Sequence, residues 1–174
     1  MKDLLTLELL DNLNLYQSIR NYIFKNDLIG RPILDVVDYL EKNEQNYMNW
    51  FVYKYCQDIK DIKELWQQLT DDEYIYKYCR YIKDRKELWQ QLTNNFYTYL
   101  YCRDVKDRKE LWQRLKDDHY IYVYCLNIKD RKKLWQKLTD DEYIYDYCRN
   151  VKHRQELVNK ITDEYYTNKL KELK

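Results

Sequence analysis

Residues 76–102 read YKYCRYIKDRKELWQQLTNNFYTYLYC and contain two copies of a tyrosine-flanked cysteine, Cys79 and Cys102. The 23-residue interval between them recurs along the chain, which places all five cysteines at Cys56, Cys79, Cys102, Cys125 and Cys148. Self-similarity with a period of about 20–50 residues is typical of solenoids and repeat arrays, in which one supersecondary unit is copied in tandem. The interval therefore predicts the architecture before any single motif is considered.

Each copy predicts two helices, which we call helix A and helix B. Helix A is indicated by apolar residues at i, i+3, i+4 and i+7, which share one helical face: Ile75, Tyr78, Cys79 and Ile82. A shorter helix B is indicated in the same way by Leu88, Trp89 and Leu92. A 23-residue helix pair is too small to bury both of its faces alone, so the copies are expected to stack on one another.

The start signals of both helices recur with the same period. The segments Thr70–Glu73 and Thr139–Glu142 both read TDDE, which predicts a capping box with threonine as the N-cap of helix A. Asp84, three residues before Glu87, predicts the analogous start of helix B. The repeats contain neither glycine nor proline, so their turns should need no residue with positive φ.

The predicted fold is all-α, an α-solenoid of about five tandem 23-residue helix-turn-helix repeats with helical caps at both ends. We expect an N-terminal cap over residues 1–46, in which Pro32 begins a helix, repeats over 47–162, and a capping helix over 163–174. These three parts are expected to form one continuous domain.

Segments such as Asp84–Leu92, DRKELWQQL, make the chain resemble leucine-rich variant repeats, whose units of similar length pair two short helices. The resemblance covers about Trp50 to Thr162 and implies the same solenoid class. This chain lacks the asparagine-proline turns of that family. It also lacks the cysteine cluster that holds an iron–sulfur centre in one member, so the resemblance implies no cofactor here.

The cysteines are expected to be free thiols in the core. Equivalent atoms of adjacent repeats should lie about one helix spacing apart, roughly 8–10 Å, whereas a disulfide needs Cα atoms about 4.4–6.8 Å apart. The same separation argues against a zinc site, and the two histidines, His119 and His153, occupy non-equivalent positions. We therefore expect no metal and no cofactor.

Composition gives no overall electrostatic preference for a class of partner. The chain has 31 basic and 30 acidic residues, so its net charge of +1 gives no overall attraction to nucleic acid or to an anionic membrane. No apolar run is long enough to span a bilayer, and the apolar N-terminal stretch contains acidic residues, unlike a secretory signal. The sequence predicts an intracellular, cytoplasmic protein without a membrane partner.

No constellation of residues indicates an enzyme. The chain has one serine, Ser18, and it has no glycine-rich phosphate loop and no HExxH motif. We therefore expect a non-enzymatic protein.

Positions where the copies differ point to a binding surface. Two columns of helix A lie opposite the core stripe, and in the middle copies they become apolar while arginines remain around them. We expect the apolar residues to be exposed and adjacent, with Phe96 and Tyr81 near them. An apolar centre with an arginine rim is typical of a protein-recognition patch. The predicted partner-binding residues are Arg80, Leu100, Arg103, Val123, Leu126 and Arg149. The expected function is a protein–protein interaction scaffold or a small regulator or inhibitor, with a partner whose identity the sequence does not give.

Two alternatives stay open. Aromatic residues interleaved with lysines are also typical of proteins that bind RNA or single-stranded DNA, and the residues that would do so are Tyr76, Tyr99, Tyr122, Lys83, Lys106 and Lys129. Core packing explains the tyrosines better than base stacking does, because a tyrosine that recurs at helical spacing is usually a core residue with its hydroxyl at the rim. We expect a monomer, and end-to-end self-association of the array is the other alternative.

Overall fold

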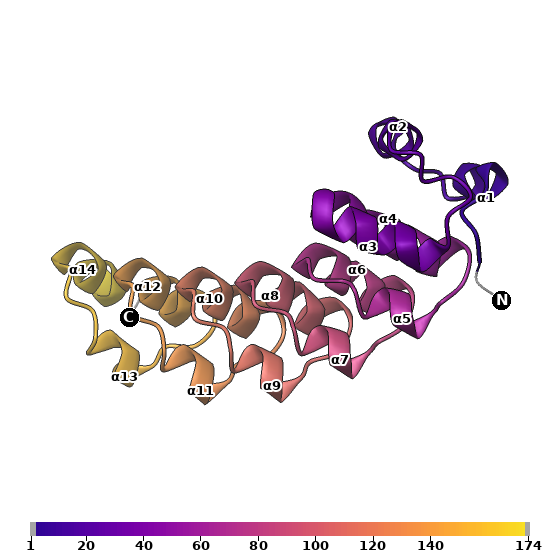
Figure 1. The fold of residues 1–174 in the computed structure, drawn as a ribbon. Coiled ribbons are helices and arrows are strands. Elements are labelled where there is room, and N and C mark those ends of the chain that lie inside the picture. Colours follow the sequence, from indigo (N-terminus) through magenta and orange to yellow (C-terminus); the bar gives the residue numbers. More distant parts are fainter. Residues whose placement is uncertain (1–2, 173–174) are drawn as a thin grey trace. The chain divides into compact units, whose positions relative to one another are not determined.

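The structure is a computed structural model that describes residues 3–172, and it is all-α, as predicted (Figure 1). The chain divides at Gln91–Leu92 into two compact units, which are described separately. Residues 1–2 and 173–174 of the predicted caps lie outside the described residues. The predicted boundaries between caps and repeats remain a prediction.

The repeats consist of helix pairs. Helix A is α4 (Gln45–Asp58), α6 (Asp72–Tyr81), α8 (Asn95–Asp104), α10 (Asp118–Asn127), α12 (Asp141–Asn150) and, at the C-terminal end, α14 (Glu164–Glu172). Helix B is a single turn in each copy: α5 (Lys63–Trp66), α7 (Lys86–Trp89), α9 (Lys109–Trp112), α11 (Lys132–Trp135) and α13 (Gln155–Val158). In the first unit α4 contacts α6, and in the second α8, α10, α12 and α14 contact one another in turn. This stacking of regularly spaced pairs is that of a helical solenoid (Figure 1).

Before the repeats, the first unit contains α1 (Leu7–Asn12), α2 (Gln17–Lys25) and α3 (Ile33–Asn43), and α3 packs on α4. A short extended segment pairs with the start of α3 through an antiparallel bridge between Leu4 and Pro32. The backbone N–H of Ile33 donates to the Asp3 carbonyl at 2.9 Å. This pairing fixes Asp3 beside the first repeat.

The core follows the predicted stripe. In helix A the buried positions of α6 include Ile75, Tyr78 and Cys79, and helix B contributes Leu88 and Trp89. The five cysteines are free and buried, as expected from the spacing of stacked helices. The repeats also need no positive φ, because the residues with positive φ in the described chain are Asn14, Asp27 and Gly30.

The predicted threonine caps are wrong by one residue. The N-cap of α6 is Asp71, whose side chain accepts hydrogen bonds from the N–H groups of Glu73 and Tyr74. In the copy that begins at Thr139, the N-cap is likewise Asp140. The Thr139 hydroxyl instead donates a hydrogen bond to the Asp118 carboxylate of the preceding helix A, at 3.1 Å.

The predicted start of helix B at Asp84 is also wrong. The N-cap of α7 is Arg85, and its side chain makes no capping hydrogen bond. The equivalent aspartate of the previous copy, Asp61, receives hydrogen bonds from Tyr78 and Arg85 of the next copy. An aspartate at this position therefore joins two repeats instead of capping its own helix.

Candidate functional site

The outward face of helix A changes character along the repeats. Residues at i, i+4 and i+7 share this face, and in α6 and α12 they are charged: Glu73, Lys77 and Arg80, then Glu142, Asp146 and Arg149. In α8 and α10 the same places are held by Phe96, Leu100 and Arg103, then by His119, Val123 and Leu126.

The apolar members of this face form what we call the α8–α10 surface: Phe96, Leu100, Val123 and Leu126. The two helices are in contact within the second unit. Phe96 is 41% exposed and Leu126 is 43% exposed. Leu100 and Val123, expected to be exposed, are half-buried, and each lies between two buried or half-buried tyrosines along its helix. The surface therefore has two exposed apolar ends and a partly covered centre.

Aromatic rings extend this surface toward the start of both helices. The Phe96 ring lies 6.0 Å from the Tyr120 ring and 5.0 Å from the Tyr97 ring, between centroids. These three residues line a shallow hollow together with Asn94, Asn95 and Asp117. A partner side chain placed in this hollow would touch Phe96, which helix patterning alone assigns to solvent.

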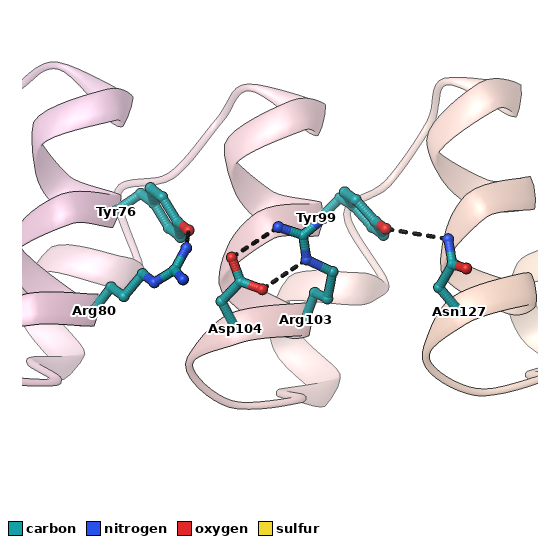
Figure 2. Close-up of polar contacts among 6 residues, drawn as sticks. All are labelled: Tyr76, Arg80, Tyr99, Arg103, Asp104 and Asn127. Carbon is teal, nitrogen blue, oxygen red and sulfur yellow. Dashed lines mark hydrogen bonds and ion pairs between the residues drawn. The ribbon is translucent and has the colours of Figure 1, made fainter.

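The arginines predicted to surround the apolar centre are exposed, and two of them make local contacts (Figure 2). Arg103 forms a two-point pair with Asp104, at 2.6 and 2.9 Å, which raises the pKa of its guanidinium. Arg80 donates a hydrogen bond to the Tyr76 hydroxyl, and its guanidinium lies 5.0 Å from the centre of the Tyr81 ring. Arg80 belongs to the first unit, whereas Arg103 and Arg149 belong to the second.

The tyrosines of the nucleic-acid alternative are mostly core residues. Tyr76 and Tyr99 are only 6% and 7% exposed, and Tyr122 is half-buried. Two of the hydroxyls accept hydrogen bonds from the next copy: Asn127 donates to Tyr99 at 3.3 Å (Figure 2), and Asn150 donates to Tyr122 at 2.9 Å. The lysines that would accompany them, Lys83, Lys106 and Lys129, are exposed.

The structure also contains a contact between repeats that the sequence patterns above did not identify. A tyrosine hydroxyl donates to the aspartate of the preceding copy, and an arginine pairs with the same carboxylate while lying over the preceding tryptophan. In the second unit Tyr147 and Arg154 each bond Asp130 at 2.6 Å, and the Arg154 guanidinium lies 4.9 Å from the Trp135 ring centre. We call this arrangement the inter-repeat clamp.

The same clamp joins Tyr124 and Arg131 to Asp107 and Trp112 in the second unit. In the first unit it joins Tyr78 and Arg85 to Asp61 and Trp66. Burial and the aspartate hydrogen bond raise the pKa of Tyr124 and Tyr147, so these hydroxyls remain protonated donors. Its regular use marks the clamp as part of the scaffold.

The thiols show no sign of activation. Burial raises the pKa of Cys56 and Cys125 to about 11 and that of Cys102 to about 12. A reactive cysteine needs a lowered thiol pKa. No group of three or more histidine, cysteine or acidic residues in the described part of the chain could hold a metal ion. No helix formed by residues 3–172 is both long and apolar enough to cross a membrane.

No protein-family model, curated protein or solved structure matches this chain. The helix-turn-helix units with a period of about 23 residues are present. Membership of the leucine-rich variant family remains a prediction.

Proposed function

We propose that the protein is a non-enzymatic interaction scaffold that holds another protein on the α8–α10 surface. The observation that carries the proposal is the replacement of charged residues on the outward face of α6 and α12 by apolar ones in α8 and α10. The α10 helix has its core residues on one face and adds Val123 and Leu126 on another. These two side chains widen the apolar surface of α10 beyond its core-facing stripe, and apolar surface that the core does not use often marks an interaction site.

The composition of the surface fits recognition of a protein segment. Phe96 and Leu126 supply exposed apolar area, and burying apolar surface is the main favourable term in association. Arg103 and Arg149 stand at the exposed edge, where charges mainly set specificity and the rate of association. The partner we expect is a segment with an apolar face and acidic residues beside it. If the partner is an enzyme, the protein would act as its regulator or inhibitor.

The test is affinity capture from lysate of the source cell, followed by mass spectrometry, with the wild-type chain and two single variants. Leu126→Asp places a charge in the α8–α10 surface, whereas the control Gln136→Asp places the same charge at an exposed position at the end of α11. We expect a partner that the wild type and the control retain and that Leu126→Asp loses. Equal capture by all three would contradict the assignment of the surface.

The alternative function is binding of RNA or single-stranded DNA along the lysine column. The buried tyrosine rings give it less support, because base stacking needs an accessible ring face. Nuclease treatment of the same capture separates the two functions. Loss of recovery after nuclease, together with loss in a Lys106→Glu/Lys129→Glu variant, would favour nucleic acid, and its affinity should then fall steeply with salt.

A further inference from the structure

The first unit contains a pocket of about 480 Å³ between the start of α3 and the start of α5. Its apolar walls include Pro32, Ile33, Ile62 and Leu65. Its polar lining includes Asp3 and Tyr55, and the Tyr55 hydroxyl donates to the Asp3 carboxylate at 3.4 Å. Tyr55 is only 1% exposed, so its hydroxyl reaches the pocket from within the core.

The later repeats show what this arrangement of groups holds. Tyr55 is the first member of the tyrosine column that continues as Tyr78, Tyr101, Tyr124 and Tyr147. In the next copy, Tyr78 donates to Asp61, and the Arg85 guanidinium bonds the same carboxylate at 2.6 Å and lies 3.4 Å from the Tyr78 hydroxyl. A tyrosine–aspartate pair of this protein is therefore completed by a guanidinium.

The first copy has the pair and lacks the guanidinium. The residue 23 positions before Arg85 is Ile62, which is shorter, uncharged and part of the pocket wall. Asp3 takes the place that Asp61 has beside Tyr78, and it is fixed there by the hydrogen bond from the Ile33 N–H to its carbonyl. The pocket thus lies at the position where the following copies place the half-buried side chain of an arginine.

We propose that this pocket binds the guanidinium group of an arginine side chain carried by a partner polypeptide. A planar guanidinium can bond the Asp3 carboxylate and the Tyr55 hydroxyl together while its faces contact the apolar walls, which an ammonium group cannot do. The site is separate from the α8–α10 surface, so it can be tested independently.

The charges of the lining agree with a cationic ligand. Besides Asp3, the lining has Asp35 and Glu64 as carboxylates, and Lys60 and Lys63 oppose them. Asp61 also lines the pocket, but its carboxylate already pairs with Arg85. Asp35 lies in the first turn of α3, where it offsets the positive end of the helix dipole. The free amino acid carries a carboxylate that these residues would repel, so an arginine within a chain is the expected ligand.

The binding test uses N-acetyl-arginine amide as the probe, with N-acetyl-lysine amide, N-acetyl-citrulline amide, free arginine and inorganic phosphate as comparisons. We follow backbone amide shifts of residues 33–35 and 60–65 by NMR on the full chain. The arginine amide should bind about tenfold or more tightly than the lysine and citrulline amides, because only it offers both charge and a planar fork. The arginine amide should also bind more tightly than free arginine. The Asp3→Asn variant should bind the arginine amide more weakly than the wild type does. The proposal would be overturned if the citrulline amide bound as tightly as the arginine amide, if phosphate bound more tightly, or if the arginine amide caused no shifts. If free arginine bound as tightly as the arginine amide, the ligand would be the free amino acid and not an arginine within a polypeptide.

A second variant tests the assignment by supplying the guanidinium from within the chain. Ile62→Arg should complete the clamp in the first copy, raise the melting temperature by about 2–4 °C and abolish binding of the arginine amide. Gln67→Arg is the control, because it adds the same charge at an exposed position of the same unit that does not line the pocket. An Ile62→Arg protein that is no more stable than the control and still binds the probe would overturn the proposal. Leu126→Asp should bind the arginine amide like the wild type, which separates this site from the proposed function.

Discussion

At the scale of single residues, the buried tyrosine of each clamp has two roles. Tyr147 fills core volume and is fully buried, and its hydroxyl also connects its repeat to Asp130 of the preceding one. Sequence spacing identified only the first role, because the aspartate lies 17 residues away in a different copy. A hydrogen bond to a charged acceptor contributes more to stability than one between two neutral groups.

Tyr147→Phe should lower the free energy of unfolding by about 1–2 kcal/mol. The ring is retained, so the loss isolates the hydroxyl, and Asp130 keeps Arg154 as a partner. Urea denaturation measures the effect. Tyr165→Phe is the matched control, because Tyr165 is 60% exposed. A Tyr147→Phe protein as stable as this control would mean that the hydroxyl contributes nothing to the junction.

The buried thiols predict a loss of stability in alkali. Burial raises the pKa of Cys56 and Cys125 to about 11 from an ordinary value of 9.0. The unfolded chain therefore releases these protons first, so their contribution is complete below pH 9 and is lost as the pH rises to about 11. Because one pKa unit corresponds to about 1.4 kcal/mol, even half of the shift of one thiol is measurable.

This prediction is checked by urea denaturation at several values between pH 8 and pH 11. Tyrosines also ionise in this range, and burial raises the pKa of Tyr55 to about 12. The comparison is therefore with Cys56→Ala/Cys125→Ala, in which the decline with pH should be shallower. Parallel curves for the two proteins would assign the decline to other groups.

At the scale of the helices, the apolar period correctly predicted both helices of each copy, because burial of one face decides where they lie. The capping predictions failed for a common reason. Thr139 and Asp61 have the residue types that cap helices, but both are engaged by another copy. Local capping rules consider one helix at a time, so contacts between stacked units are outside their reach.

The helix starts are held by a second contact between copies. Asp118 of α10 accepts hydrogen bonds from the backbone N–H groups of Thr139 and Asp140, at 2.7 and 2.6 Å. In the first unit Asn49 of α4 does the same for Thr70 and Asp71, at 2.8 and 3.1 Å. A neutral carbonyl oxygen is therefore sufficient for this contact.

From this equivalence we expect Asp118→Asn to change the free energy of unfolding little, whereas Asp118→Ala should lower it by about 1–2 kcal/mol, because two backbone donors lose their acceptor. Urea denaturation of both variants tests the prediction, with the asparagine variant as the control for loss of charge. Equal destabilisation by both would assign the effect to charge and contradict the hydrogen-bond account.

At the scale of the whole molecule, the pairing between copies was present in the sequence as an offset between two columns. One repeat position is aspartate in four successive copies, from Asp61 to Asp130. The next position is arginine in four successive copies, from Arg85 to Arg154, so the arginine column begins and ends one copy later than the aspartate column. Such an offset is expected when each aspartate pairs with the arginine of the following copy. The pocket beside Ile62 could not be predicted in this way, because Asp3 lies outside the repeats and is brought there by the backbone pairing at Pro32.

The candidate surface could be predicted in part. The change from charged to apolar residues in the middle copies identified Leu126, and helical spacing placed Leu100 and Val123 near it. Their half-burial depends on the rotation of α8 and α10 against their neighbours, which the sequence period does not specify. The ion pair between Arg103 and Asp104 likewise could not be predicted from the sequence, because it depends on the side-chain conformations.

The solenoid stacking in each unit predicts that stability grows with the number of copies, because each added repeat contributes its own terms and one more interface. Inserting a second copy of residues 93–115 directly after Leu115 would create a junction in which Asp107 meets an added Tyr101 and Arg108, as it now meets Tyr124 and Arg131. The urea midpoint should rise, and the m-value should increase by about one eighth, in proportion to chain length. Urea denaturation followed by circular dichroism measures both the midpoint and the m-value.

The matched control is the same insertion with phenylalanine and asparagine at the added positions 101 and 107. It keeps the apolar core of the new repeat while removing the tyrosine hydroxyl and the aspartate charge from its clamps. We expect its midpoint to lie between those of the original chain and the full insertion, because burial and the clamp contribute separately to each interface. A full insertion that unfolds at lower urea than the original chain would show that the interfaces are not interchangeable, and that each junction depends on its own pair of copies.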